Sequence, residues 1–324
     1  MKKAIIAAFA AAIAFTLPAS AAEYPDHTLT MVIPFAAGGP TDVLGRIMAQ
    51  SMGEILGQTI IVENIGGAGG MSGSRKVADA KPDGYTMLLG TVGTHAQGQT
   101  LYKKPLYNAV TDFEQVVLNS DSARVLIARR DLPANTFPEF VAYAKANQNK
   151  MQYGSAGAGS GTHVCAVLLD VAMGTRITHV PYRGAGPAMQ DLIAGRIDYI
   201  AEQISTALPQ IQGGTVKPIV TLGLDRAPGL ENLATAEEQG LTGLDCGSWG
   251  SFSFPKGTPR AIIERLAKAS NEAVETPAVR ERFKDIGVVI PAAARRTPDY
   301  LAKFVVSETA RWAGPIKASG AMID

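Results

Sequence analysis

Short apolar runs alternate with helical patterns along the first part of the chain. Residues 29–33 form an apolar-rich segment that Pro34 closes, which is typical of a buried strand. From Asp42 to Leu56 the apolar positions fall at helical spacing. The other predicted elements are a strand at 59–62, a helix at 74–80 and a strand at 85–89. This alternation predicts a mainly parallel sheet with helices on both faces.

The same alternation begins again after about residue 121. Asn135 and Thr136 form a capping signal for a helix at 137–145. The other predicted elements are strands at 125–128, 152–154, 177–180, 198–201 and 219–222, with helices at 162–173 and 187–194. This region is therefore expected to be a second α/β unit.

The C-terminal segment returns to longer helical patterns, which are found at 259–275, 277–286 and 298–312. We expect these helices to pack back on the first unit. Domain one would then comprise residues 22–120 plus 245–324, and domain two residues 121–244. Two strands would cross between the domains and form a hinge.

The first 21 residues have the features of a secretory signal peptide. Lys2 and Lys3 precede a short apolar run at 5–17, and Ala19-Ser20-Ala21 matches a small-x-small cleavage site. The run is shorter than the roughly 20 residues that a membrane-spanning helix needs, which disfavours a retained anchor. We expect cleavage after Ala21 and a periplasmic mature protein.

The charge balance excludes two classes of partner. Cleavage removes two of the 30 basic residues and none of the 29 acidic ones, so the mature chain has 28 against 29 and a net charge of −1. A nucleic-acid partner would need a concentrated basic surface, and a membrane-binding patch would need clustered lysines and arginines. Neither is expected here.

The two cysteines, Cys165 and Cys246, leave two interpretations open. Export permits a disulfide. However, Cys165 lies in an apolar helical stretch, Cys246 lies beside a turn, and two cysteines do not form a disulfide framework. We predict free thiols, since a chain of this length does not need a cross-link.

Four segments share one design, in which a strand is followed by a glycine-rich loop and a helix. They are residues 34–42, 64–70, 154–163 and 180–187. A helix start has backbone N–H groups without partners and carries partial positive charge, and glycine lets an anion approach the backbone. One such loop is explained by a tight turn alone. Four loops in two domains predict a dianion site across a cleft.

Five side chains in or near these loops have two interpretations each. Phe35 and Tyr182 either fill the core or form walls of a ligand cleft. Asp42 complements the helix dipole or orders waters at a ligand. Arg183 pairs with a carboxylate or faces solvent. Glu202 accepts from a ligand amine or hydroxyl, or forms a hinge salt bridge.

The sequence contains no Walker A loop, no Gly-x-Ser-x-Gly elbow and no His-Glu-x-x-His motif, and its four histidines lack metal-ligand spacing. Neither a cofactor nor a metal is expected. Ser160 and His163 lie on one helical turn and could be imagined as nucleophile and base. We favour a capping role for Ser160, with His163 lining the cleft or donating one hydrogen bond.

Taken together, these motifs resemble the Bug solute receptors, which are the periplasmic binding components of tripartite tricarboxylate transporters. The motifs are Pro34-Phe-x-x-Gly-Gly-x-Thr-Asp42, Gly-Ala-Gly-Gly70, Gly154-Ser-x-Gly-x-Gly-Ser160 and Val180-Pro-Tyr-Arg-Gly184. Further matches are Pro82-Asp-Gly-Tyr85, Arg226, Trp249 and Pro255-Lys-Gly-Thr-Pro259. The resemblance covers essentially the whole mature chain, in order.

The resemblance implies a two-domain periplasmic-binding-protein fold that closes on its ligand like a Venus flytrap, without catalysis. It implies that the first and third loops hold the ligand carboxylate, partly through waters. The implied contacts are Phe35, Ala37, Gly38, Gly39, Thr41, Asp42, Thr91 and Thr94 from domain one, and Ala156, Gly157, Ser160, Thr162 and His163 from domain two, with Tyr182, Arg183 and Glu202 as additional candidates. Ala156, Ala158, Cys165 and Glu202 depart from the commonest family pattern. The ligand therefore stays open among dicarboxylates, amino acids and aromatic acids.

Our main hypothesis is a monomeric receptor that captures a small carboxylate and delivers it to the membrane subunits of a tripartite tricarboxylate transporter. An exported hydrolase using Ser160 and His163 is the first alternative. A ligand-sensing subunit for a membrane sensor is the second, since it would need the same fold.

Overall fold

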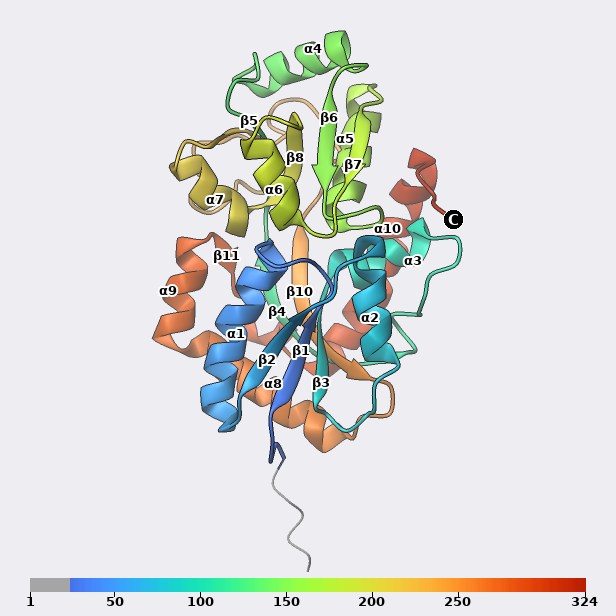
Figure 1. Ribbon diagram of the computed structural model, residues 1–324, viewed down its shortest axis with the longest axis vertical. Coiled ribbons are helices and arrows are strands. Elements are labelled where there is room, and N and C mark those ends of the chain that lie inside the picture. The colour runs from blue at the N-terminus through green and yellow to red at the C-terminus, as the bar shows by residue number, and fades with distance from the viewer. Residues whose placement is uncertain (1–23) are drawn as a thin grey trace, which may run out of the picture.

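The computed structural model describes residues 24–324, so the predicted signal peptide lies outside the described residues. The strands form two sheets, each flanked by helices (Figure 1). The first sheet, in the order β11-β4-β10-β3-β1-β2, forms what we call lobe one, and the second, in the order β7-β6-β8-β5-β9, forms lobe two. In this part of the chain, no helix combines the length and the hydropathy that crossing a membrane requires.

Lobe one contains the N-terminal and C-terminal parts of the chain. Its strands are β1 (Leu29–Ile33), β2 (Ile60–Asn64), β3 (Thr86–Thr91), β4 (Phe113–Ser122), β10 (Ser248–Pro255) and β11 (Val288–Val289). Its α-helices are α1 (Pro40–Leu56), α2 (Met71–Ala78), α3 (Gly98–Leu101), α8 (Arg260–Glu275), α9 (Pro277–Asp285) and α10 (Pro298–Ser319). Short 3₁₀ turns at η1 (Ala68–Gly70) and η3 (Ala293–Arg295) and a π-helical turn at η2 (Gly93–Gln97) complete it.

Lobe two contains the middle of the chain. Its strands are β5 (Arg124–Arg129), β6 (Gln152–Ser155), β7 (Thr178–Pro181), β8 (Tyr199–Gln203) and β9 (Val216–Thr221). Its helices are α4 (Phe137–Asn147), α5 (Gly161–Met173), α6 (Ala185–Ile193) and α7 (Ile204–Gln212). The predicted two-domain α/β fold with helix-flanked sheets is confirmed.

Both sheets are mixed, whereas the strand–helix alternation predicted mainly parallel sheets. In lobe one, β1 is parallel to β2 and β3, but β10 is antiparallel to β3 and β4. In lobe two, β6 is parallel to β7 and β8, but β5 is antiparallel to β8 and β9. The antiparallel pairs involve the strands next to the two crossings between lobes, and β4 and β10 were not predicted from the sequence.

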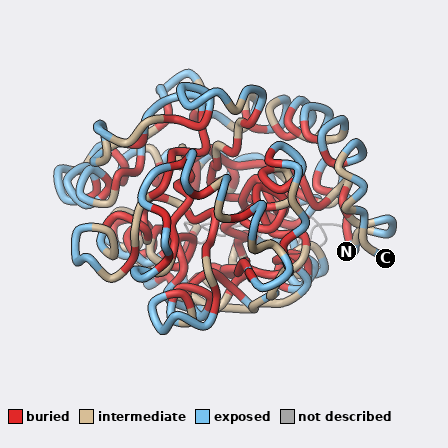
Figure 2. Tube along the Cα trace, turned by 90° about the horizontal axis from the view of Figure 1, so that it is seen from above, coloured by how far each residue is buried: buried red, intermediate tan, exposed pale blue. Residues whose placement is uncertain are grey.

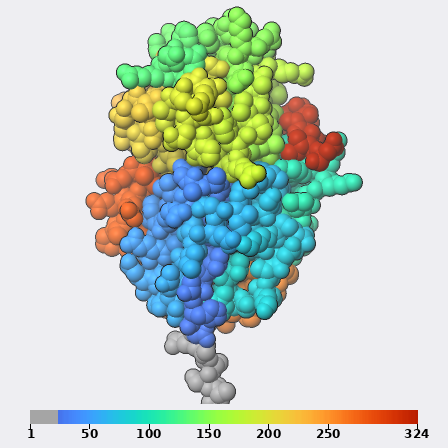
Figure 3. All heavy atoms as spheres, in the orientation of Figure 1, coloured from blue at the N-terminus to red at the C-terminus, as the bar shows by residue number. Residues whose placement is uncertain are grey.

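The chain crosses between the lobes at two adjacent places. Only Ala123 separates β4 from β5, so the chain passes from one sheet into the other almost without a break. It returns just before β10. Figure 3 shows the middle of the chain as the upper lobe, resting directly on the N-terminal segments of the lower lobe. The domain bounds at 120/121 and 244/245 stay a prediction.

Each lobe has its own apolar core. Leu29 and Met31 of β1 pack in one cluster with Leu266 of α8 and Phe283 of α9, so the C-terminal helices do return to the first sheet. In lobe two, a separate cluster lies between α4, α5 and the sheet. Figure 2 shows the buried positions in the interior of the molecule, with the exposed ones on the outer turns and loops.

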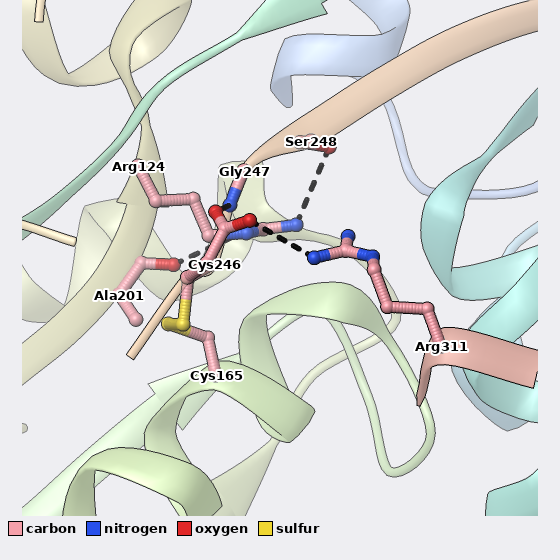
Figure 4. The surroundings of a disulfide bond; sticks show 8 residues. Arg124, Cys165, Ala201, Cys246, Gly247, Ser248 and Arg311 are labelled. Carbon is pink, nitrogen blue, oxygen red and sulfur yellow. Dashed lines mark hydrogen bonds and ion pairs between the residues drawn. A yellow bond between two sulfur atoms is a disulfide. The ribbon is translucent and has the colours of Figure 1, made fainter. Parts of the chain in front are cut away.

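The prediction of free thiols was wrong, because Cys165 and Cys246 form a disulfide (Figure 4). Cys165 lies on α5, and Cys246 lies on the segment that returns to lobe one. Both pack in the core of lobe two, with their Cα atoms 5.6 Å apart, which suits a disulfide. They are 81 residues apart in sequence, so tertiary packing alone brings them together.

Candidate functional site

The two lobes enclose a small cavity of about 20 Å³, which is roughly the space that one water molecule needs. Its walls come from both lobes. The lining residues are Phe35, Gly39, Pro40, Thr41 and Thr91 from lobe one, and Arg124, Ala156, Ser160, Gly161, Thr162, Ala185 and Gln203 from lobe two. The structure is therefore closed, and a larger molecule enters only if the lobes move apart.

The four glycine-rich loops face one another across this closed interface. Ala36 N–H in the first loop donates to the carbonyl of Arg183 in the fourth loop at 2.9 Å. Gly69 in the second loop packs so closely on the third that a Cβ there would lie 2.3 Å from the carbonyl oxygen of Ala158. Glycine at these positions lets the backbones of the two lobes touch.

The first loop leads into an uncapped helix start. Gly39 is the N-cap of α1 and offers no side chain to the first turn, and Pro40 brings no N–H of its own. The N–H groups of Thr41 and the next residue thus have no capping side chain, and Thr41 and Gly39 both line the cavity. This helix start carries partial positive charge into the closed interface.

Asp42 shapes the first loop from behind the cavity. Its buried carboxylate accepts from Gly38 N–H at 2.9 Å, from Arg46 Nε at 3.0 Å and from Asn64 Nδ2 at 3.0 Å. Burial raises the pKa of Asp42, but the hydrogen bonds from Arg46, Gly38 and Asn64 outweigh it and leave the pKa below its usual value. Gly38 has a φ of +81°, and its amide is held by this contact.

Replacing Asp42 by asparagine is expected to lower the free energy of unfolding by about 1–3 kcal/mol near neutral pH, because charged hydrogen bonds are lost. The folded pKa lies below the unfolded value of 3.8. The wild-type advantage is therefore full above that value and disappears as the pH falls through the folded pKa. Urea unfolding of both proteins between about pH 7 and pH 2 measures the difference.

Asp79→Asn is the matched control. Asp79 forms a similar i,i+4 ion pair with Arg75, but both side chains are about half exposed. Asp79→Asn should lower the free energy of unfolding by no more than about 0.5 kcal/mol. A loss at Asp42→Asn that persists unchanged below about pH 3 would mean that shape, and not charge, is what Asp42 supplies.

The third loop is tied together by its hydroxyl groups. Ser160 is the N-cap of α5, and its Oγ accepts from His163 N–H at 3.4 Å and donates to the Gly157 carbonyl at 2.7 Å. Thr162 Oγ1 accepts from Ala156 N–H at 2.8 Å. Ser160, Thr162 and Ala156 line the cavity, and their role as ligand contacts stays a prediction. Gly157 lies beside them and packs on the backbone of Gly69.

His163 points away from the Ser160 hydroxyl. Its Nδ1 accepts from Gly159 N–H at 3.2 Å, and its ring stacks on His179 at 4.2 Å. Burial lowers the pKa of His163 to about 4. Ser160 is held through the backbone N–H of His163, and not through the imidazole. The geometry therefore does not pair the Ser160 hydroxyl with the His163 imidazole as nucleophile and base.

The fourth loop contributes backbone to the interface. The Arg183 side chain is exposed, while its carbonyl accepts from the other lobe. Tyr182 OH donates to Asp191 Oδ2 at 2.7 Å. Tyr182 lines an open groove of about 830 Å³ beside the closed cavity, together with Ala37 and Gly38 of the first loop.

Two other predicted site residues lie outside the cavity. Thr94 is fully buried, and its Oγ1 accepts from Thr91 N–H at 2.9 Å, so it holds the end of β3 while Thr91 lines the cavity. Glu202 is also fully buried, and its Oε1 accepts from Gln203 N–H and from Thr206. Burial raises the pKa of Glu202 to about 6. Gln203, its neighbour, lines the cavity in its place.

Arg124 and Gln203 are the cavity residues with long polar side chains that sequence reasoning missed. They are register partners on β5 and β8, so their side chains share one face of the sheet. Arg124 stands directly before the apolar run 125–128, at the junction of the two units. A charged residue at that place is the signal that was available in the sequence.

Comparison with known proteins agrees with this geometry. Residues 44–321 match the model of the tripartite tricarboxylate transporter family receptor, TctC. A protein of Agrobacterium vitis from the TAR-I ttuE-ttuC' intergenic region is 39% identical over 298 residues, which are 92% of this chain and 86% of that protein.

Solved structures extend the comparison. The periplasmic binding protein BugD superposes with a TM-score of 0.90 at 38% identity, covering 92% of this chain and 99% of BugD. MatC from Rhodopseudomonas palustris with bound malate superposes with a TM-score of 0.88 at 36% identity, covering 90% of this chain and 100% of MatC. The chain belongs to the TctC family of tripartite tricarboxylate transporter receptors, the Bug solute receptors, which bind ligands without catalysis.

Proposed function

We propose that this protein captures a small carboxylate between its lobes and delivers it to the membrane subunits of a tripartite tricarboxylate transporter. One observation carries the proposal: the uncapped start of α1 and the glycine-rich loops of both lobes meet at one closed cavity. Backbone N–H groups at a helix start are an anion site. The malate bound by the related MatC supports a carboxylate as the guest.

The ligand contacts in this proposal are the cavity-lining residues. Gly39 and Thr41 offer backbone N–H groups, while Ser160 and Thr162, whose hydroxyls tie the third loop together, line the facing wall in lobe two. Phe35, Ala156 and Ala185 form a small apolar cluster at the same place, which suits the carbon chain of the ligand. Because the cavity is smaller than a dicarboxylate, ligand uptake requires opening and reclosing of the lobes.

A periplasmic location belongs to the same proposal. The signal-peptide features of residues 1–21 support it, as does the similarity to the periplasmic binding protein BugD. The receptor would meet its ligand outside the inner membrane and present the closed form to the transporter.

A carboxylate that fits the site is expected to stabilise the purified mature protein. At a concentration of 100 times its dissociation constant, the ligand would raise the free energy of unfolding by about 2.7 kcal/mol. A thermal-shift screen of succinate, malate, adipate and their monocarboxylate counterparts, followed by calorimetric titration of the hits, measures this. The matching diols serve as uncharged controls. Stabilisation by the diols alone, or by none of the acids, would contradict a carboxylate receptor.

A further inference from the structure

Arg124 is a buried cation that faces the cavity. It is the first residue of β5, its exposed fraction is 2%, and it lines the space between the lobes. The guanidinium lies against the start of α5, where a Cβ on Gly161 would be 2.3 Å from Nη2. Glycine at that position leaves the room that the guanidinium occupies.

The donors of Arg124 are poorly satisfied by the protein. A guanidinium has five N–H groups. Nη1 donates to the Ala201 carbonyl at 3.4 Å and Nη2 to Ser248 Oγ at 3.5 Å, both near the limit for a hydrogen bond (Figure 4). Among residues 24–324, Nε has no hydrogen-bond partner and no carboxylate lies within ion-pair distance of the guanidinium. A buried charge in this condition is costly unless an anion joins it.

Neither Asp245 nor Glu202 forms an ion pair with Arg124 among residues 24–324. Asp245 pairs with Arg311 at 2.9 Å. Glu202 lies on the opposite face of the sheet, because its register partner is Val125. Its Oε1 accepts from Gln203 and Thr206, while its buried Oε2 has no hydrogen-bond partner among residues 24–324. Burial lowers the pKa of Arg124 to about 10, against the opposing effect of Glu202. The guanidinium therefore stays charged at neutral pH.

We propose that Arg124 binds a second carboxylate of the ligand, so that the receptor selects dicarboxylates over monocarboxylates. This inference rests on the proposed function. One carboxylate would lie at the α1 start in lobe one, and the other would pair with Arg124 and with Gln203 beside it in lobe two. The same ligand would thereby bridge the lobes and satisfy the buried charge.

Calorimetric titration at neutral pH with matched acids tests the inference. The probes are succinate with butyrate, malate with 3-hydroxybutyrate, and adipate with hexanoate, each pair sharing one carbon chain. Wild-type protein should bind one dicarboxylate at least about 30-fold more tightly than its monocarboxylate partner, as expected for a buried charge pair. Arg124→Met should remove this preference and leave the weaker monocarboxylate affinity unchanged.

Two further variants control for folding. Arg296→Met removes another buried guanidinium, which pairs with Glu275 at 2.6 Å in lobe one, and it should leave dicarboxylate affinity unchanged. Arg124→Lys keeps the charge and should retain part of the preference even if the methionine variant unfolds. Urea unfolding of each variant, without ligand, separates loss of fold from loss of binding.

The outcomes discriminate between the two proposals. If no acid of the panel binds to the wild type, both proposals fall. Two results would overturn the role of Arg124 but leave the proposed carboxylate receptor intact. In the first, the wild type binds a dicarboxylate no more tightly than its matched monocarboxylate. In the second, Arg124→Met lowers the affinity for both acids of a pair equally. A double variant, Arg124→Met/Glu202→Gln, gives a further check. If it regains the preference for dicarboxylates, the role of Arg124 in binding is also overturned, since Arg124 would then act only by balancing the charge of Glu202.

Discussion

Replacing Gly186 by alanine is expected to weaken carboxylate binding roughly 100-fold while leaving the fold at least as stable. Gly186 lies in the first turn of α6 in lobe two. A Cβ there would lie 2.6 Å from the carbonyl oxygen of Ala37 and 3.0 Å from the carbonyl carbon of Gly38, both in lobe one. The clash exists only when the lobes are closed, so it penalises the bound form.

The magnitude follows from two opposing effects. Overpacking against backbone costs up to about 3 kcal/mol, which corresponds to about 100-fold in affinity when closure is required for binding. Alanine is more favourable than glycine in a helix by about 1 kcal/mol. This gain stabilises the open form and the closed form alike, so the variant should remain folded. Calorimetric titration with a dicarboxylate that the wild type binds measures the affinity, and urea unfolding without ligand measures the stability.

Gly314→Ala is the matched control for this experiment. Gly314 lies in α10, and a Cβ there would meet nothing within 4 Å. The control should gain stability and keep its affinity. An unchanged affinity in Gly186→Ala would show that the ligand binds without the close contact between Gly186 and the first loop. The proposal that the ligand bridges the two closed lobes would then be wrong.

Removal of the disulfide is expected to lower the free energy of unfolding by about 4–5 kcal/mol. The bond closes a loop of 81 residues, and in the chain-entropy description a longer loop constrains the unfolded state more. This loop contains most of lobe two, from α5 through β9, together with the returning segment. The loss should therefore appear chiefly in lobe two.

Urea unfolding of Cys165→Ala/Cys246→Ala, compared with oxidised wild type, measures the effect. Reductant should destabilise the wild type and leave the double variant unchanged, which separates the cross-link from the loss of side-chain volume in the core. Two free thiols in the folded, exported protein, titrated under denaturing conditions, would refute the pairing.

Much of the site's framework could be read from local sequence. A strand that ends at Pro34, a glycine pair and a following helix predicted the uncapped start of α1, because each of these features acts within a few residues. The same holds for Ser160, whose predicted capping role is confirmed by its hydrogen bond to His163 N–H. The placement of Thr94 and Glu202 could not be read in this way. Thr94 lies in the π-helical turn after β3, and Glu202 lies on β8, where the face that its side chain uses depends on how the sheet packs.

What the sequence determined by itself is the set of helix starts, glycine-rich loops and apolar faces, because propensity, capping and hydrophobic periodicity are local. Only the tertiary structure decided which loops meet, that Cys165 reaches Cys246, and that Arg124 turns into the cavity with Nε unpaired among residues 24–324. These relations join residues far apart in the chain. They arise when two sheets pack against each other, and no local pattern encodes them.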